Sequence, residues 1–302
     1  MRRAFGLLLI FVLMCGMCAV AAAQEQSGVQ NPPKVLVIGR EFVKPGRSGM
    51  SHAKTESAFV QAMMKANWPV HYVAMDSMSG KNRSLFLTGY DSFDAWEKDM
   101  RATEKNTALT TALDQAGVID GNLLDATDQS VLVYADEMSL RPAVDIAHMR
   151  YMEIEVFHVK PGHRQEWTDA VKMVKDAYEK SVPDAHWAMY RLMYGGAGGT
   201  FVVFTPMKSV GEVDQMMTAS KKFGAALGED GMKKLSELEA AALDSSEINL
   251  FTFNPRMSYA PPEWIKANPE FWKPKTMVAS GKATKKEEAG VNPAAAKSTT
   301  GQ

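Results

Sequence analysis

The tetrapeptide Val43-Lys44-Pro45-Gly46 occurs a second time as Val159-Lys160-Pro161-Gly162. Each copy follows a run rich in β-branched residues, which is typical of a strand, and precedes a stretch of helical composition. The two prolines are 116 residues apart, and His71 and His186, which begin matching strand-like runs, are 115 residues apart. This spacing predicts a tandem repeat of one α+β unit along the chain.

The predicted elements follow the same order in both units. The first unit has strands at 34–43, 71–78, 84–88 and 130–134 and helices at 51–67 and 92–113, and the second has strands at 152–159, 186–194, 200–204 and 247–253 with helical stretches after Gly162 and at 210–227. A β-α-β-β-α-β order is the ferredoxin-like arrangement, in which the helices cover one face of the sheet. The other face needs a cover of its own. We therefore predict an α+β fold in which two ferredoxin-like βαββαβ repeats pack sheet-to-sheet as an intramolecular α+β barrel.

The duplicated strand, Val-Lys-Pro-Gly turn, helix and glycine hairpin resemble the dimeric α+β barrel superfamily. That group includes the NIPSNAP proteins and the antibiotic-biosynthesis-type monooxygenases. The resemblance covers residues 34 to about 254 and implies a tandem fused repeat, so that one chain would form the whole barrel. Members include haem-degrading oxygenases, cofactor-free oxygenases, isomerases and proteins with no known activity, so the fold alone implies no particular reaction.

The N-terminal residues 1–23 have the layout of a signal peptide. Arg2 and Arg3 precede an apolar run, and the small residues of 21–23 precede a polar segment. An uncleaved anchor is the alternative, because 4–23 carries no charge and is just long enough to span a membrane. With cleavage, we expect an exported protein, periplasmic or extracellular, that is not attached to a membrane.

The remaining boundaries follow from shifts in composition. Proline and aromatic residues alternate after the second repeat, and the last stretch is rich in Ala, Lys, Ser and Thr, which is typical of disorder. The predicted segments are a linker at 24–33, a first ferredoxin-like repeat at 34–143, a second at 144–255, a Pro/aromatic C-terminal arm at 256–275 and a disordered tail at 276–302.

Composition argues against several classes of partner and cofactor. Cys15 and Cys18 both lie in the leader, so a mature chain would have no thiol for a disulfide, a nucleophile or a zinc–cysteine site. Without Arg2 and Arg3 the chain has 32 basic residues against 35 acidic ones, and no basic block stands out. We expect no nucleic-acid partner. Nothing in the sequence fixes the oligomeric state.

Strand alternation points to a polar surface between the two units. On 152–159 the aliphatic Ile154 and Val156 are expected to face the helices. The acidic residues between and beside them, Glu153 and Glu155, would then face the other half. The strand at 186–194 presents an indole and a guanidinium on one face, and an aspartate aligns with that guanidinium in the first unit. The candidate ligand-binding cavity is therefore lined by Asp76, Glu153, Glu155, Trp187 and Arg191. The competing interpretation is a salt-bridge network that sets how the halves dock, without catalysis.

The six histidines form no recognised ligand motif such as H-E-x-x-H. His52 lies four residues before Glu56, and His71 and His186 take equivalent positions at strand starts. We predict structural or surface roles, no metal site and no resident cofactor. Haem, which the superfamily implies, remains the alternative cofactor.

No motif identifies a catalytic residue, so whether the chain is an enzyme stays open. The favoured function is an exported small-ligand-binding or accessory protein that uses the cavity between the two repeats. The alternative is a cofactor-poor monooxygenase or a haem-handling enzyme of the dimeric α+β barrel type.

Overall fold

The computed structural model describes residues 28–47 and 49–273. The predicted signal peptide or anchor, and the predicted tail at 276–302, lie outside these residues. No helix among the described residues is both long enough and apolar enough to cross a membrane.

Eight antiparallel strands close into one barrel. They are β2 (Val35–Val43), β3 (Tyr72–Ser77), β4 (Arg83–Tyr90), β5 (Leu124–Tyr134), β7 (Tyr151–Val159), β8 (Ala188–Tyr194), β9 (Thr200–Met207) and β10 (Leu243–Phe253). The order around the barrel is β10-β3-β4-β2-β5-β8-β9-β7. The fold is therefore α+β with a closed eight-stranded barrel, consistent with the dimeric α+β barrel fold. The two four-stranded parts join edge to edge, through β5 with β8 and β10 with β3, rather than as two stacked layers.

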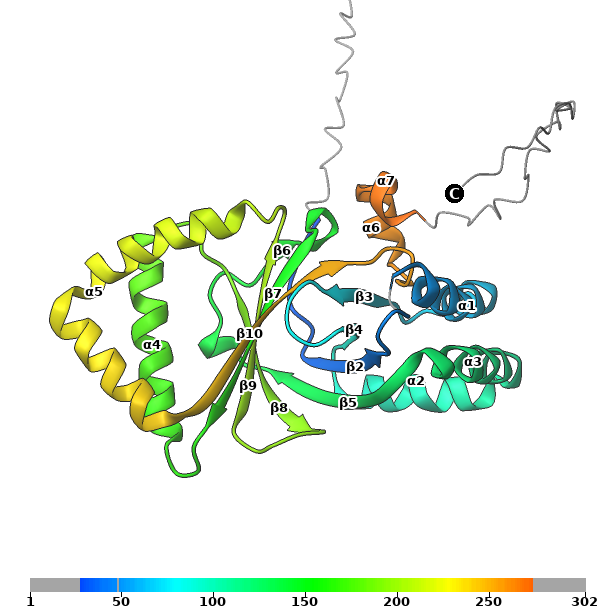
Figure 1. Cartoon of the computed structure of the whole chain (residues 1–302), viewed down its shortest axis with the longest axis horizontal. Coiled ribbons are helices and arrows are strands. Elements are labelled where there is room, and N and C mark those ends of the chain that lie inside the picture. The colour runs from blue at the N-terminus through cyan, green and yellow to red at the C-terminus, as the bar shows by residue number, and fades with distance from the viewer. Residues whose placement is uncertain (1–27, 48, 274–302) are drawn as a thin grey trace, which may run out of the picture.

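Helices cover the outside of the barrel on two opposite flanks (Figure 1). The first flank carries α1 (Met50–Ala66), α2 (Phe93–Lys105) and α3 (Thr107–Asp120), and the second carries α4 (Arg164–Ser181) and α5 (Glu212–Ala242). The single helix predicted at 92–113 is two helices, because Asn106 ends α2 and its side chain accepts a hydrogen bond from the Leu109 amide to begin α3. The corresponding break in α5 is at Gly228, which has φ 67°.

The Val-Lys-Pro-Gly turn has the same role in both halves. Gly46 and Gly162 adopt φ of 76° and 89°, a region that glycine enters without steric cost. Lys44 donates from its amide to Leu123 O and from Nζ to Asn122 O, just beyond the end of α3. Lys160 donates from its amide to Ala242 O and from Nζ to Ala240 O, at the end of α5. The lysine thus satisfies carbonyls at or beside a helix C-terminus, where a positive charge is favourable.

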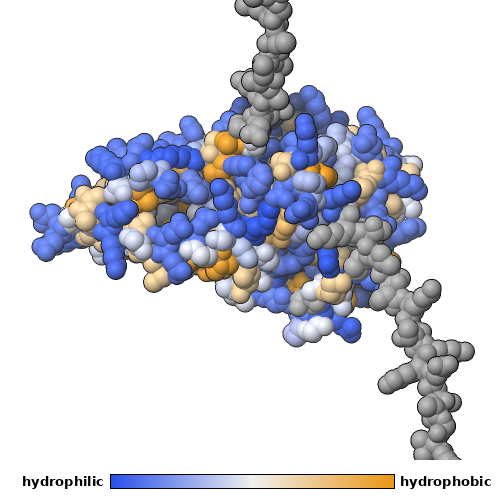
Figure 2. All heavy atoms as spheres, turned by 90° about the horizontal axis from the view of Figure 1, so that it is seen from above, coloured by the Kyte–Doolittle hydropathy of each residue, from blue (hydrophilic) through white to orange (hydrophobic). Residues whose placement is uncertain are grey.

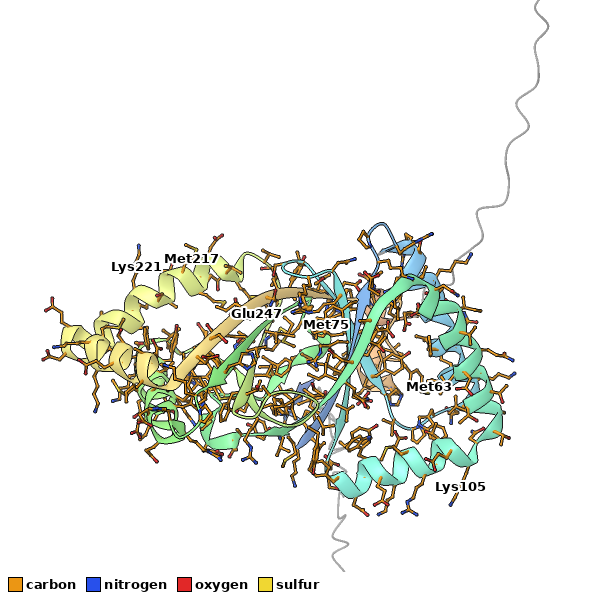
Figure 3. All side chains as sticks on the ribbon, turned by 60° about the horizontal axis from the view of Figure 1, so that its bottom comes forward. Met63, Met75, Lys105, Met217, Lys221 and Glu247 are labelled. Atoms are coloured by element: carbon orange, nitrogen blue, oxygen red, sulfur yellow. The ribbon has the colours of Figure 1, made fainter. Side chains whose placement is uncertain are left out.

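An apolar core fills the inside of the barrel. It includes Leu36, Met75, Ile154, Phe204 and Phe251, each from a different strand. Met75 is fully buried, whereas Met217 and Lys221 on α5 point away from the body (Figure 3). Seen from above, hydrophilic side chains cover most of the surface and hydrophobic ones form only small separate patches (Figure 2).

Short elements gather at one end of the barrel, along the upper side of Figure 1 from the label of β6 to that of α7. They are β1 (Val29–Gln30), β6 (Val144–Asp145), the 3-10 helix η3 (Ile146–His148), α6 (Pro262–Ala267) and α7 (Pro269–Trp272). Two further 3-10 helices, η1 (Gly121–Leu123) and η2 (Asp136–Met138), lie in other connections. Trp264 Nε1 donates to Gln30 Oε1 at 2.8 Å, and Trp272 Nε1 donates to Ala147 O at 2.7 Å. The proline- and tryptophan-rich segment therefore packs on the barrel as two short helices, each starting with proline at a position that needs no amide donor.

Candidate functional site

A cavity of about 770 Å³ opens at the end of the barrel where β2 and β7 begin. Its depth is lined by aliphatic and aromatic side chains from seven strands, namely Leu36, Val73, Leu87, Met152, Ala188, Tyr190, Phe204 and Phe253. Its rim is formed by 30–34, by Val144 and Ile146, and by Pro261, Glu263 and Trp264. This volume and lining are typical of a pocket for one small organic molecule.

Most polar groups on the aromatic lining already have protein partners. Tyr90 Oη donates to Asp99 Oδ2 at 2.8 Å, and Tyr190 Oη donates to Pro33 O at 3.0 Å. Trp187 Nε1 donates to Met138 O at 2.9 Å. These side chains therefore offer the cavity their apolar faces, and a ligand there would be held chiefly by burial of apolar surface.

Two histidines line the cavity, and they differ in whether a ring nitrogen is free to contact a ligand. The ring nitrogens of His186 contact Asp184 O at 3.0 Å and Pro206 O at 2.9 Å, so both are occupied by carbonyl oxygens. His71 stacks on Tyr259 with ring centroids 4.5 Å apart. Burial lowers the pKa of His71, although the charge of Glu263 acts in the opposite direction. His71 is therefore a neutral imidazole near neutral pH and the available base of the cavity.

The cavity fits haem poorly. Both ring nitrogens of His186 contact carbonyl oxygens and are not free for iron, which leaves His71 as the one histidine of the cavity lining that could be an axial ligand. The two propionates of haem need cationic partners, yet the charged residues of the lining are Lys34 against Asp91 and Glu263. We therefore assign no step to haem.

The predicted faces of 152–159 and 186–194 are wrong. Ile154 and Val156 belong to the core inside the barrel, whereas Phe157 packs with Trp167 of α4, which places Glu153 and Glu155 on the helix-facing side. The reason is that the barrel is filled with apolar side chains, so the aliphatic set of β7 faces inward.

The five predicted site residues do not meet in one cavity. Trp187 lines the barrel-end cavity, while Asp76 lines a separate one of about 140 Å³ beside Asn254 and Arg256. Arg191 shares the helix-facing side of β8 with Trp187 and Met189. Among the described residues, no ion pair joins Asp76, Glu153, Glu155 or Arg191 to another of the four. The expected opposition of Asp76 and Arg191 is thus absent, and ligand contact by these five residues stays a prediction.

Glu155 is the predicted site residue with the largest pKa shift. Burial, followed by the charges of Glu153 and Glu239, raises its pKa from 4.5 to about 7. The folded state therefore holds a proton that the unfolded state releases above pH 4.5, so stability falls as pH rises from 4.5 through about 7.

Replacing Glu155 with glutamine is expected to stabilise the protein at pH 8 and to have no effect at pH 4. The gain is about 1 kcal/mol, because partial exposure screens much of the full effect of the shift. Urea unfolding at both pH values measures it. The exposed Glu179→Gln is the matched control, and an equal gain in the two variants would contradict the assignment to Glu155.

No family model and no curated protein matches this chain. Among solved structures, a proposed monooxygenase of Fusobacterium nucleatum is similar at 11% identity and a TM-score of 0.47, over 74% of this chain and 94% of that one. An anthrone oxidase-like protein is similar at 11% identity and a TM-score of 0.44, over 73% and 91%. A chlorite dismutase variant of Candidatus Nitrospira defluvii is similar at 9% identity and a TM-score of 0.44, over 80% and 99%. Likeness at this level carries no functional conclusion.

Proposed function

We propose that this chain binds a small, largely apolar organic molecule in the barrel-end cavity. The observation that carries the proposal is the lining: about 770 Å³ enclosed by side chains of seven strands, with Tyr90, Tyr190 and Trp187 already hydrogen-bonded to the protein. Such a surface favours binding of an aromatic or aliphatic ligand and provides few polar partners for a highly charged one.

The proposal also covers the superfamily to which the chain belongs and its cellular location. We infer that the chain is a fused tandem member of the dimeric α+β barrel superfamily, in which each half supplies four strands to the barrel. The identical strand order in the two halves and the recurring lysine contacts at Lys44 and Lys160 support this inference. Export to the periplasm or beyond completes the proposal, and sequencing the N-terminus of the secreted protein tests it.

Narrowing the cavity should weaken ligand binding. Ala188 lines the cavity on β8, and Ala188→Trp would place an indole in the space that the ligand needs. With a solvatochromic apolar probe such as N-phenyl-1-naphthylamine, we expect at least about a tenfold loss of affinity, since even one tenfold step is only about 1.4 kcal/mol.

The control is Ala240→Trp on α5, outside the cavity lining, which should leave probe binding unchanged. Equal probe affinity in the parent and in Ala188→Trp, with both folded by circular dichroism, would contradict the proposed site. Native mass spectrometry of the purified chain then identifies a co-purified ligand by mass.

A cofactor-free oxygenase is the second candidate, and one observation favours it. His71 places a neutral imidazole at a cavity whose depth is lined by aliphatic and aromatic side chains, where it could take a proton from a phenolic or enolic ligand. Oxygen uptake with such a ligand, lost in His71→Ala while binding is kept, is the expected result. Equal uptake in the variant would exclude His71 as the base.

A further inference from the structure

A second cluster of titratable groups lies outside the barrel, beneath α1. Glu41 comes from β2, His52 and Glu56 come from α1, and Asp120 ends α3. One ligand atom from each lies within 4.8 Å of all the others. His52 Nε2 is 2.9 Å from Glu41 Oε2, 3.6 Å from Asp120 Oδ1 and 4.0 Å from Glu56 Oε1. Four donor atoms thus surround one point.

One of these donors is buried and has no partner. The side chain of Glu56 is 4% exposed, and its Oε1 makes no hydrogen bond within the described part of the chain. A buried carboxylate oxygen without a donor costs free energy unless a cation or a proton satisfies it. The unpartnered atom of Glu56 is the one closest to His52, so it faces the centre of the cluster.

Hydrogen bonds from residues outside the cluster fix the positions of its donor atoms. Ser84 Oγ lies 3.3 Å from His52 Nδ1 and donates to Asp76 Oδ1 at 2.5 Å, and Asn254 Nδ2 donates to Asp76 Oδ2 at 2.7 Å. Thr55 Oγ1 donates to Asp120 Oδ1. An imidazole whose second nitrogen is held in this way is typical of metal-bound histidine, because the partner fixes the ring and its tautomer.

The second half of the chain shows that the fold does not need this cluster. Two residues before the Val-Lys-Pro-Gly turn, Glu41 is matched by Phe157, which packs on Trp167 of α4 with ring centroids 4.8 Å apart. Seven residues after the turn's proline, His52 is matched by Thr168. Apolar packing holds the equivalent helix in place, and buried charges seldom stabilise more than such packing does. The charges of the first half therefore call for another explanation.

The electrostatics of the cluster favour added positive charge. Burial acts to lower the pKa of His52, but contacts with Asp120 and Glu41 outweigh it and raise the pKa to about 10. Burial and the charges of Glu41 and Asp120 raise the pKa of Glu56 to about 9. Without a cation, the cluster compensates its three carboxyl groups with protons.

We propose that Glu41, His52, Glu56 and Asp120 bind one four-coordinate divalent transition-metal ion of the Zn²⁺ type. Tetrahedral zinc with bonds of about 2.0–2.1 Å has donor atoms roughly 3.4 Å apart, close to the separations around His52 Nε2. One imidazole with carboxylates suits such an ion, whereas Mg²⁺ and Ca²⁺ require six or more oxygen ligands. The side chain of Glu41 is 20% exposed, against 2–4% for the other three, so the ion would enter beside Glu41.

The test is a Zn²⁺ titration of the full chain, purified without a histidine tag and stripped with EDTA, against a chromophoric chelator. We expect one Zn²⁺ per chain, no displacement by excess Mg²⁺, and the visible absorption of tetrahedral Co²⁺ when Co²⁺ replaces Zn²⁺. Glu56→Gln, which keeps the side-chain shape, should weaken binding by about 100-fold or more, and Ser84→Ala, which removes the hydrogen bond behind His52, by about tenfold.

The matched control is His163→Ala, because His163 and Glu166 form an exposed pair 3.3 Å apart on the other flank. It should leave the affinity unchanged, and so should Ala188→Trp in the barrel-end cavity. No stoichiometric binding, or equal affinity in Glu56→Gln and the parent with both folded by circular dichroism, would overturn the metal site. If Glu56→Gln fails to fold, unchanged affinity in Ser84→Ala together with loss in His163→Ala would overturn it equally.

Discussion

Replacing Trp272 with alanine should lower the free energy of unfolding by about 3–5 kcal/mol, the usual cost of removing a buried Trp. Trp272 is 1% exposed although it lies next to the last described residue, Lys273. Its ring packs on Phe253 at the end of β10 and on Trp264, and its Nε1 donates to Ala147 O. The substitution leaves both a cavity and an unpaired carbonyl. Urea unfolding, followed by circular dichroism, measures the loss.

Phe271→Ala is the matched control, because this neighbouring aromatic is only half-buried and lies over the guanidinium of Arg150. It should cost about 1–2 kcal/mol, since less apolar surface is lost. A loss below about 1 kcal/mol for Trp272→Ala would mean that α7 is not docked in solution. In that case the arm would add nothing to the stability of the barrel.

Gly195→Ala should destabilise the protein by about 3–4 kcal/mol, at the upper end of single-residue effects. Gly195 directly follows β8, in the hairpin to β9, and has φ 85°. A Cβ there would lie 2.1 Å from Gln129 O of β5, which is backbone and cannot turn aside. The contact is at the seam where β5 pairs with β8, so the added methyl group would separate the two halves of the barrel.

Gly198→Ala in the same hairpin isolates this effect. Its Cβ would meet no heavy atom within 4 Å, and we expect a change within about 0.5 kcal/mol. Thermal unfolding of the two variants under one condition makes the comparison. Similar melting temperatures for both would show that the seam adapts to a side chain at 195.

The α+β class and the order of strands and helices could be predicted because they depend on local signals. The Val-Lys-Pro-Gly turn, the β-branched runs and the glycine hairpins all lie within short windows, and the α+β class and closed barrel agree with them. The break between α2 and α3 was missed, although Asn106 followed by Thr107 is a capping signal. The two short helices of the C-terminal segment could not be predicted from its prolines, since packing of Trp264 and Trp272 decides their formation.

The sites were harder to predict, because they depend on which face of a strand is covered. Alternation showed that Glu153 and Glu155 share a face, but it could not say whether that face meets helices or the barrel interior. The cluster beneath α1 was partly visible, since His52 and Glu56 are one helical turn apart. Glu41 on β2 and Asp120 at the end of α3 approach them only in the folded chain, and no local sequence pattern predicts such a long-range contact.

The closure of the barrel has a consequence for how the chain folds. Strand β3 pairs on one side with β4, but its neighbour on the other side is β10, the last strand of the barrel to be synthesised, which places Ser77 opposite Phe251. Before β8 and β10 are synthesised, the first four strands form an open sheet whose outer strands, β3 and β5, both expose backbone donors and acceptors. Such long-range pairing raises contact order and slows folding. The nascent first half is therefore the species most prone to aggregate, and the one that a chaperone would have to shield until residue 253 emerges.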